Sequence, residues 1–469
     1  MQCLPEQRKP IWERLKNTAY FAWQTKNQAR LTFQPLQRSI LAQTRRLQQM
    51  IRHAYLTVPF YSRTMDRLGL RPSDFRTVAD LSRLPSIDPS QLRSDPLQFF
   101  SRAYVPEACV QLFSSGSTGE PRSAYHTIET VLQNAAHGER ERAAFLPLVG
   151  HSYGYRETVI GASVSADHLL QKIIRTHTWV PPGVPIRRQY LSVLEPPEKN
   201  IPMINEFRPH IIRSLGSYIA MLFGYLARTD AAFHRPRVIT YSSDTLPDNI
   251  RGVVEREFGI PVFSAYEAIE ALKIGFECER HSGLHANIDL YPIRIVNENG
   301  MDAPRGELGE VVVSNLVNKA TVLLNYRLGD LAAWEEASCP CGRSLPLLKQ
   351  LAGRRDDSIR LPSGRVLHPL AAKSIFRDAP EVWQYQIVHV TPSRFHANVV
   401  AAPTADRSAL EADLKSRFLK VLEEEIHLEV RFVERIDRTR SGKTQELVSV
   451  FESRLAQQHD AQVKAVEDE

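Results

Sequence analysis

The sequence SSGSTGEP occupies residues 114–121 and follows a short apolar run, residues 110–113, with the composition of a β-strand. Its first six residues are small: Ser114, Ser115, Gly116, Ser117, Thr118 and Gly119. Glycines allow backbone N–H groups to converge on an anion, and the hydroxyl groups add donors. The stretch indicates a phosphate-binding loop, although by itself it fits a flexible Ser/Gly loop equally well. It is not a Walker A loop, because Glu120 follows the second glycine.

The chain has 469 residues, enough for two or three domains, and its 43% apolar and 24% charged residues are typical of globular proteins. The net charge of +6 comes from Lys and Arg scattered among acids, which argues against a nucleic-acid surface. A site for an anionic substrate or nucleotide explains the charge equally well. The N-terminus lacks an apolar signal segment, and no run reaches the roughly 18 apolar residues of a membrane span. Five cysteines do not suggest a disulfide framework, so we expect a cytoplasmic protein.

Hydrophobic periodicity divides the chain into regions. Helical spacing of apolar residues covers most of residues 7–70. Strands and helices then alternate between residues 210 and 265, which predicts a parallel sheet covered by helices. The sequence is β-rich from residue 290, and a smaller α+β segment begins near residue 353. We therefore predict an α/β fold with a large first domain and a small C-terminal one.

Four later motifs follow the loop in order: YEAIE (266–270), YRLGD (326–330), GRRDD (353–357) and RTRSGK (438–443). Together with the loop they resemble the motifs of the adenylate-forming superfamily, which includes acyl-CoA synthetases, luciferases and nonribosomal peptide adenylation domains. Within it, the chain is most similar to the phenylacetate–CoA ligase branch and its capsule-biosynthesis-type relatives. That similarity comes from the segments VPFYSR (58–63), LPSID (84–88) and CPCGR (339–343).

The resemblance implies both a fold and an activity. Residues 1–355 would form the adenylation domain, with parallel sheets, helices and a β-rich subdomain behind a helical N-terminal segment. Residues 356–469 would form a small mobile α+β lid, with Asp356 as the hinge. The implied reaction is ATP-dependent activation of a carboxylic acid, aryl or small acyl, to acyl-AMP. The acyl group would then pass to a thiol, with coenzyme A as the expected acceptor.

The resemblance also assigns nucleotide-binding roles. Residues 114–119 would hold the β- and γ-phosphates, and Tyr266 would stack on adenine near the loop that carries Asp244. Asp330 would accept hydrogen bonds from both ribose hydroxyl groups, because a carboxylate offers two acceptor oxygens. Arg354 would contact phosphate or ribose.

Two residues are assigned to catalysis by the same resemblance. Glu270 would bind Mg²⁺ near the phosphates, and Lys443 would bring its ammonium to the carboxylate and the α-phosphate, where charge builds. The chain departs from the family pattern where Glu120 replaces a lysine, Glu267 a glycine and Ile269 a hydroxyl residue. These departures keep open a second interpretation, a catalytically weakened nucleotide-binding homologue.

A candidate zinc site combines a C-x₆-H pair with a C-x-C pair: Cys278, His285, Cys339 and Cys341. Three thiolates and one imidazole make a tetrahedral zinc set, and the resemblance implies a structural role. His281 is the alternative histidine ligand. Free cysteines without a metal remain the alternative to the whole site.

The substrate side of the site is less defined. Residues 150–155 and 216–218 carry small and aromatic side chains and are candidate walls of the acid pocket. The acceptor stays open between coenzyme A, a carrier-protein thiol, and an amine or hydroxyl group in secondary-metabolite or polysaccharide biosynthesis. The sequence leaves the identity of the acid and the oligomeric state open.

Overall fold

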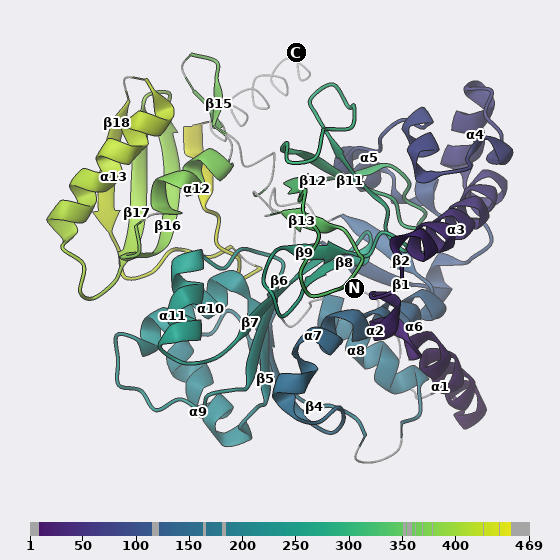
Figure 1. Ribbon diagram of the computed structural model, residues 1–469, viewed down its shortest axis with the longest axis horizontal. Coiled ribbons are helices and arrows are strands. Elements are labelled where there is room, and N and C mark those ends of the chain that lie inside the picture. Colours follow the sequence, from purple (N-terminus) through teal and green to yellow (C-terminus); the bar gives the residue numbers. More distant parts are fainter. Residues whose placement is uncertain are drawn as a thin grey trace, which may run out of the picture.

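The structure is a computed structural model with three parts: a central sheet with its covering helices, a group of N-terminal helices, and a separate C-terminal domain (Figure 1). It describes residues 9–114, 122–162, 166–180, 184–349, 353, 359–361, 363–367, 369–377, 379–424, 426–439 and 441–451. Within these ranges, no helix is long and apolar enough to cross a membrane.

The N-terminal segment is helical, as predicted. It contains α1 (Ile11–Thr25), α2 (Gln28–Leu31), α3 (Leu36–Thr57) and α4 (Pro59–Arg67). Pro59 opens α4, because proline at the first helical position gives up only an N–H that would be unpaired anyway. Helix α3 buries one stripe at helical spacing, formed by Leu47, Met50, Ile51 and Ala54, against the β-rich part of the chain.

The central sheet has 11 strands in the order β10-β11-β12-β13-β9-β8-β7-β6-β5-β3-β4. Its parallel half consists of β3 (Arg156–Gly161), β4 (Arg187–Ser192), β5 (Ile211–Leu215), β6 (Val238–Ser242) and β7 (Val262–Ala268). Its antiparallel half consists of β8 (Leu272–Glu277), β9 (Leu284–Ala286), β10 (Ile293–Val296), β11 (Gly309–Val313), β12 (Tyr326–Trp334) and β13 (Leu347–Lys349). The predicted parallel sheet and the predicted β-rich region are therefore continuous.

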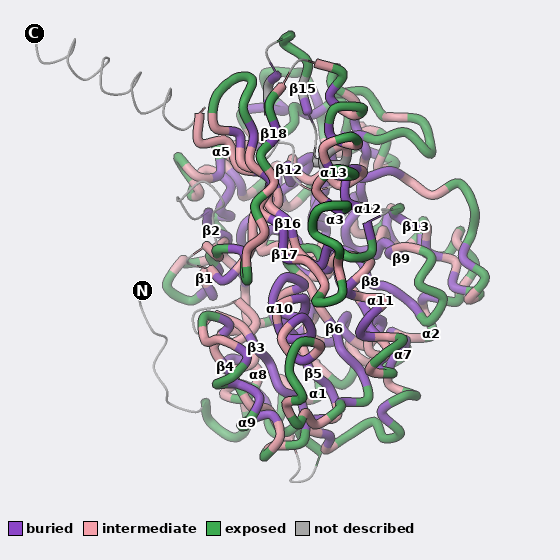
Figure 2. Tube along the Cα trace, turned by 90° about the vertical axis from the view of Figure 1, so that its left-hand side faces the viewer, coloured by how far each residue is buried: buried purple, intermediate pink, exposed green. Residues whose placement is uncertain are grey.

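Helices cover both faces of the parallel half. One face carries α6 (Ile128–His137), α7 (Glu139–Val149) and α8 (Ala166–His177), and the other carries α9 (Pro197–Phe207), α10 (Gly216–Leu226) and α11 (Asp248–Arg256). Successive strand residues point to opposite faces, so Ile211 packs with Phe145 of α7 while Ile212 packs in the core with α9, α10 and α11. Figure 2 shows buried residues along β3, β6 and α10.

Short elements lead into this core. They are η1 (Pro72–Asp74), η2 (Val78–Arg83), α5 (Pro89–Ser94), η3 (Pro96–Phe99) and η4 (Pro106–Ala108). A two-stranded antiparallel hairpin follows, formed by β1 (Val110–Phe113) and β2 (Ser123–His126). The apolar run before the glycine-rich loop is thus a strand, as predicted. The hairpin was not predicted, because its second strand has no clear apolar alternation.

The C-terminal domain has its own four-stranded sheet, order β18-β17-β16-β19, and its own apolar core. Its elements are β14 (Ile359–Arg360), β15 (Val366–Leu367), α12 (Pro369–Arg377), β16 (Val382–Thr391), β17 (Arg394–Ala401), α13 (Arg407–Leu422), β18 (His427–Phe432) and β19 (Leu447–Ser449). The predicted small α+β unit is present. The exact boundary at residues 355 and 356 stays a prediction, because it falls outside the described residues.

The two domains meet at the carboxyl ends of β5 and β6. Trp383 of the C-terminal domain packs into the core around α10, with its Cε3 3.4 Å from the position that a Cβ at Gly224 would take. Gln384 Nε2 donates to the Ser217 carbonyl over 3.2 Å, and Lys373 Nζ donates to Thr245 Oγ1 over 3.2 Å. The C-terminal domain therefore covers the loops that follow these strands.

Gly216 permits a close approach between two loops of the large domain at this junction. A Cβ at Gly216 would lie 2.5 Å from the backbone nitrogen of Leu246 and from the carbonyl carbon of Thr245. Backbone atoms cannot yield cheaply, and overpacking typically costs about 1–3 kcal/mol. We expect Gly216→Ala to lower the melting temperature in thermal unfolding.

Gly224→Ala is the matched control, because it lies in the same helix and its Cβ would make only ordinary contact with Trp383. Helix propensity favours alanine over glycine by up to ~1 kcal/mol, so this variant should be neutral or slightly more stable. Equal losses of melting temperature in both variants would contradict the explanation by close approach.

Candidate functional site

The candidate site lies where several strands end side by side. β5, β6 and β7 are parallel, so the residues after their carboxyl ends meet at one edge of the sheet, the usual ligand-binding edge of such folds. This edge brings together Ser217, Asp244 and Tyr266, which are far apart in sequence. Strand β12 adds Asp330 from the antiparallel half.

Tyr266 and Asp330 are joined directly. The Tyr266 hydroxyl donates to Asp330 Oδ2 over 2.6 Å, and the tyrosine is only 5% exposed. The bond fixes the orientation of the carboxylate that was predicted to bind ribose. It also links the YEAIE motif to the YRLGD motif, as their shared role in nucleotide binding would require.

Glu270 is buried and forms a second hydrogen-bonded link between the same two motifs. The Tyr326 hydroxyl donates to Glu270 Oε1 over 3.0 Å, and Arg122 Nε lies 3.5 Å from the same oxygen. Arg122 Nη1 also donates to the Tyr326 hydroxyl over 3.2 Å. Burial and then the charge of Glu270 raise the pKa of Tyr326, so its hydroxyl stays protonated and can donate.

Arg122 also closes the base of the glycine-rich loop. Its backbone N–H donates to Ser114 Oγ and its carbonyl accepts from the Ser114 N–H, both over 2.9 Å. The predicted residues Ser115, Gly116, Ser117, Thr118 and Gly119 lie outside the described residues, as do Arg354 and Asp356. Sequence reasoning missed Arg122. The available signal was its position directly after the loop's proline.

Asp244 is held by the N-terminus of α10. The Ser217 N–H donates to Oδ1 over 3.2 Å, and the Ser217 hydroxyl donates to Oδ2 over 2.5 Å. Burial raises the pKa of Asp244 to about 6, although the bonds from Ser217 and the charge of Lys443 both lower it. The structure therefore brings the predicted residues Asp244 and Lys443 within electrostatic range.

Lys443 ends a tight turn that docks on the large domain. The Thr439 N–H donates to the Lys443 carbonyl over 2.8 Å, and Gly442 has a φ of 85°. A Cβ at Gly442 would lie 2.4 Å from Val193 Cγ1, so the turn packs tightly against the end of β4. The guanidinium of Arg438 lies 5.8 Å from the centre of the Tyr218 ring at the start of α10.

Glu267, one of the departures from the family pattern, belongs to a buried ionic network. Lys273 Nζ lies 2.5 Å from Glu267 Oε1 and 2.9 Å from Glu141 Oε2. Arg213 bridges Glu141 and Glu157 over 3.3 and 3.5 Å. Burial opposes ionisation of Glu141, but Lys273 and Arg213 outweigh it and lower its pKa to about 2. Five secondary-structure elements contribute to this network, which the sequence did not indicate.

The two candidate walls of the acid pocket lie at opposite ends of the parallel strands. Residues 150–155 precede β3, whereas residues 216–218 follow β5, and the two strands are parallel. Residues 216–218 lie at the edge that carries Asp244. The prediction that both segments line one pocket is therefore wrong, because parallel strands put a preceding loop and a following loop at opposite ends.

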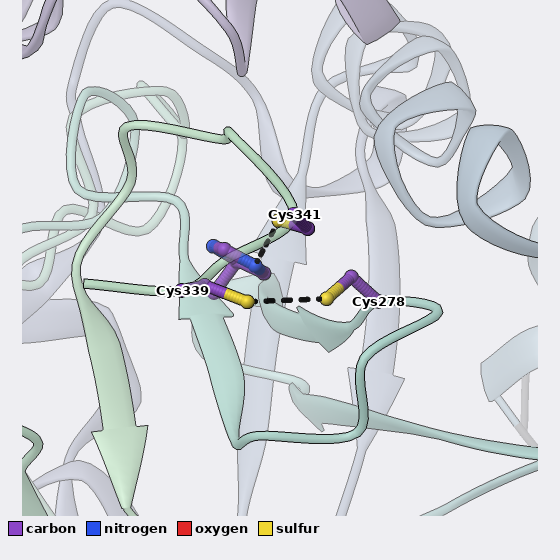
Figure 3. Close-up of side chains that lie close together, drawn as sticks. Cys278, Cys339 and Cys341 are labelled. Atoms are coloured by element: carbon purple, nitrogen blue, oxygen red, sulfur yellow. Dashed lines mark hydrogen bonds between the residues drawn. The ribbon is translucent and has the colours of Figure 1, made fainter. Parts of the chain in front are cut away.

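The four predicted zinc ligands form one cluster. Their ligand atoms all lie within 4.8 Å of one another: Cys278 Sγ, Cys339 Sγ, Cys341 Sγ and a ring nitrogen of His285. The sulfur atoms of Cys278 and Cys339 point toward one another over 3.6 Å (Figure 3). Sulfur ligands about 2.3 Å from a tetrahedral zinc ion would lie about 3.8 Å apart, so the spacing fits zinc.

Hydrogen bonds around the cluster orient its donors. His285 Nδ1 lies 3.1 Å from the Leu345 carbonyl, and Nε2 lies 3.3 Å from Cys341 Sγ. Donation from Nδ1 to the carbonyl leaves the Nε2 lone pair facing the sulfur atoms, the usual arrangement of a zinc-bound histidine. The histidine of this cluster is His285 and not His281, whose Nδ1 contacts Arg251 and Glu277.

Known proteins resemble the chain over most of its length. No family model matches it. A phenylacetate–coenzyme A ligase of Thermus thermophilus is 26% identical over 407 residues, which cover 82% of this chain and 83% of the relative. The chain is similar to the phenylacetate–CoA ligases over most of its length.

Protein CapK of Staphylococcus aureus is 20% identical over 411 residues, covering 86% of this chain and 87% of that protein. The relatives therefore include CapK as well as the phenylacetate–CoA ligases. A crystal structure of 2-hydroxyisobutyryl-CoA ligase has a TM-score of 0.73 at 18% identity and covers 92% of this chain and 93% of its own. The chain therefore has the fold of a CoA ligase, as predicted.

The raised pKa of Asp244 makes the free energy of unfolding depend on pH. The folded protein keeps a proton that the unfolded chain releases between the ordinary pKa of 3.8 and about 6, so stability falls as pH rises through this window. Asp244→Asn cannot ionise. The free energy of unfolding of this variant, relative to that of the native chain, should rise by up to roughly 3 kcal/mol between about pH 4 and pH 7.

Urea denaturation of both proteins across this range measures the difference. Ser217→Ala is the control, because it removes the hydrogen bonds of the hydroxyl group while leaving Asp244 able to ionise. A stability difference between Asp244→Asn and the native chain that stays constant with pH would show that Asp244 ionises normally in the folded state.

Proposed function

We propose that this relative of the phenylacetate–CoA ligases activates a carboxylic acid with ATP and transfers the acyl group to coenzyme A. The observation that carries the proposal is the hydrogen-bonded chain from the loop base through Glu270 and Tyr326, together with the Tyr266–Asp330 pair. These contacts join three motifs at one sheet edge. The names of the relatives favour an aryl or small acyl acid.

Asp330 would bind the ribose. Its Oδ2 already accepts from Tyr266, and carboxylate oxygens carry two lone pairs each, so both oxygens can accept ribose hydroxyl groups. The Tyr266 ring, held by the same bond, would offer one face to adenine. Asp244 would lie at the adenine side of the site, at the end of β6.

Glu270 is the residue that would hold Mg²⁺. Among the described residues, Tyr326 and Arg122 contact the Glu270 carboxylate at Oε1. Oε2 can therefore serve as an oxygen ligand. A bound Mg²⁺ would neutralise charge on the phosphates. Glu270 itself would orient that ion through the fixed position of Oε1 against Tyr326.

Lys443 would stabilise the transition state of adenylation. Attack of the acid's carboxylate oxygen on the α-phosphorus forms the acyl-AMP bond and releases pyrophosphate, with charge spread over the phosphate oxygens. The docked turn brings Lys443 to the edge that carries Asp244. A positioned ammonium there lowers the barrier, because it is held before the charge develops.

Transfer to the thiol would need a different position of the C-terminal domain. In the structure this domain covers the ends of β5 and β6, and the charge of Lys443 acts on Asp244 of the large domain. Rotation about Asp356, the hinge suggested by the family resemblance, would withdraw Lys443 and admit the thiol of coenzyme A. The thiolate would then attack the acyl carbon and release AMP.

A second part of the proposal is a structural zinc ion bound by Cys278, His285, Cys339 and Cys341. The cluster ties β9 and the turn after β8 to the loop that precedes β13. Zinc would fix these segments relative to one another. It would take no part in the reaction, because all four tetrahedral positions are filled by protein donors.

Lys443→Ala tests the adenylation half-reaction. We expect ATP–pyrophosphate exchange, measured over a panel of aryl and small acyl acids, to fall at least about a hundredfold, the usual loss for one positioned electrostatic group. Thioester formation from preformed acyl-AMP should fall much less. Lys420→Ala, on an exposed part of α13, is the control.

Each outcome separates the competing functions. Exchange with thioester formed only when coenzyme A is present supports the proposal. Exchange without thioester points to a carrier protein, an amine or a hydroxyl acceptor. No exchange with any acid, in a folded protein that binds ATP, would indicate the weakened homologue. Equal losses in both half-reactions of Lys443→Ala would contradict the role given to Lys443.

Metal analysis of the purified chain tests the zinc site. We expect about one zinc per chain, and Cys341→Ser should lower both zinc content and melting temperature, because a tetrahedral site loses one of four donors. Cys109→Ser is the control, since Cys109 is buried in a separate cluster. Zinc absent from the native chain after purification without chelators would contradict the site.

A further inference from the structure

Helix α1 exposes its large apolar side chains instead of burying them. A helix on the surface of a globular protein normally turns an apolar stripe toward the core and a polar face toward water. No residue of the 15-residue α1 is buried. Ile11, Trp12, Leu15 and Trp23 are 56%, 65%, 47% and 68% exposed. The described part of the fold therefore leaves these four side chains in water.

The opposite face of α1 attaches the helix to the rest of the protein through polar groups. Arg14 Nε and Nη2 donate to the Thr178 carbonyl over 3.0 and 2.7 Å. Asn17 Nδ2 donates to the His177 carbonyl over 3.0 Å, and Thr18 Oγ1 donates to the carbonyl after Thr178 over 2.8 Å. Residues three and four apart share one side of a helix, so these bonds fix which face α1 turns to solvent.

The exposed apolar residues form one stripe along the helix. Trp12, Leu15, Ala19 and Trp23 are all exposed and follow one another at helical spacing. At a rise of 1.5 Å per residue, the two tryptophans lie about 16 Å apart along the helix axis. The helix lies at the rim of the molecule, on the side away from the C-terminal domain (Figure 1). Nothing in the described chain stands between the stripe and solvent.

Cations and no acids accompany this stripe on the exposed side of α1. Lys9, Lys16 and Lys26 are exposed next to the apolar residues. Residues 9–30 contain five Lys or Arg and a single acid, Glu13, which is half-buried. We call the stripe and these three lysines the α1 face. It is both apolar and positively charged.

The charge and shape of the α1 face select the kind of partner. In a twofold dimer the same patch meets itself, so lysines would face lysines, and like charges across an interface oppose association. A stable protein–protein interface covers roughly 800 Å² per partner. The stripe is only one helix wide, about 10 Å. A lipid bilayer sets no such requirement, because a single helix can lie in its surface.

The residue types of the α1 face also match a bilayer. Tryptophan rings favour the boundary between lipid headgroups and acyl chains. Lysine can lay its apolar stem along such a boundary and keep its ammonium group at the headgroups. Anionic headgroups attract clustered cations that lie within a Debye length of the surface.

We propose that the α1 face binds the surface of an anionic lipid bilayer. The rings of Trp12 and Trp23 enter the boundary region, and the lysine ammonium groups contact the lipid phosphates. The C-terminal domain lies on the other side of the molecule, so binding leaves it free to move (Figure 1). This inference goes beyond the proposed function, since it involves neither the nucleotide nor the acid.

Vesicle co-sedimentation of the native chain tests the proposal. We expect binding to vesicles of mixed phosphatidylglycerol and phosphatidylcholine to be at least about tenfold tighter than binding to phosphatidylcholine alone, because the lysines attract the anionic headgroups. High salt should weaken this binding, since exposed charges are screened. Tryptophan emission should shift to shorter wavelength on binding, as Trp12 and Trp23 leave water.

Variants of α1 locate the binding surface. Trp12→Ser combined with Trp23→Ser should lower the affinity for anionic vesicles at least about tenfold, because it removes the two largest apolar side chains of the α1 face. Lys16→Gln should lower it about fivefold, as for loss of one cation near an anionic surface. Leu419→Ser is the control, since Leu419 is 48% exposed on α13, outside the α1 face, and its loss should leave the affinity unchanged.

The outcomes that would overturn the proposal are distinct. A native chain that does not bind anionic vesicles, or binds neutral vesicles equally well, contradicts it. So does binding that the two α1 variants leave unchanged while circular dichroism shows them folded. A dimer in sedimentation equilibrium that dissociates in the tryptophan variant would mean that a second copy covers the α1 face instead. None of these measurements uses ATP or an acid, so failure here leaves the proposed function untouched.

Discussion

The buried contact between Arg122 and Glu270 is the interaction on which the candidate site depends. Both side chains are almost fully removed from water, and each would be costly without the other. Tyr326 contacts both, so the start of β12 is fixed against the base of the glycine-rich loop. Asp330, four residues after Tyr326, accepts a hydrogen bond from the Tyr266 hydroxyl. The Arg122–Glu270 ion pair thereby helps to set the relative positions of the glycine-rich loop, the YEAIE motif and the YRLGD motif.

A second constraint comes from the sheet. Parallel strands β5, β6 and β7 deliver their following loops to a single edge, and Gly216 lets two of those loops touch. The C-terminal domain contacts the same loops through Lys373 and Gln384. Movement of that domain would therefore change the surroundings of Asp244. Its ionisation is favoured by the nearby charge of Lys443 and opposed by burial. We therefore expect the position of the C-terminal domain and the protonation of Asp244 to be coupled.

Much of the fold followed from local patterns. The apolar stripe of α3, the strand–helix alternation around β5 and β6, and the separate α+β ending could all be predicted, since they rest on spacing of 3.6 or 2 residues. The four zinc-ligand candidates could be named from their spacing. The pocket walls could not be predicted, because placing residues 150–155 requires knowing that β3 and β5 run parallel. The Glu267–Lys273–Glu141 network was missed for a related reason, as its members come from α7, β7 and β8.

By itself, the sequence determined the class of fold, the order of the motifs and the residue types available for nucleotide and metal. These are properties of short segments, where side-chain type and spacing act locally. Only the tertiary structure decided which residues meet: Arg122 with Glu270, Tyr266 with Asp330, and His285 rather than His281 with the three cysteines. Such choices depend on contacts across the chain, because burial forces each charge or donor to find a partner wherever the fold brings one.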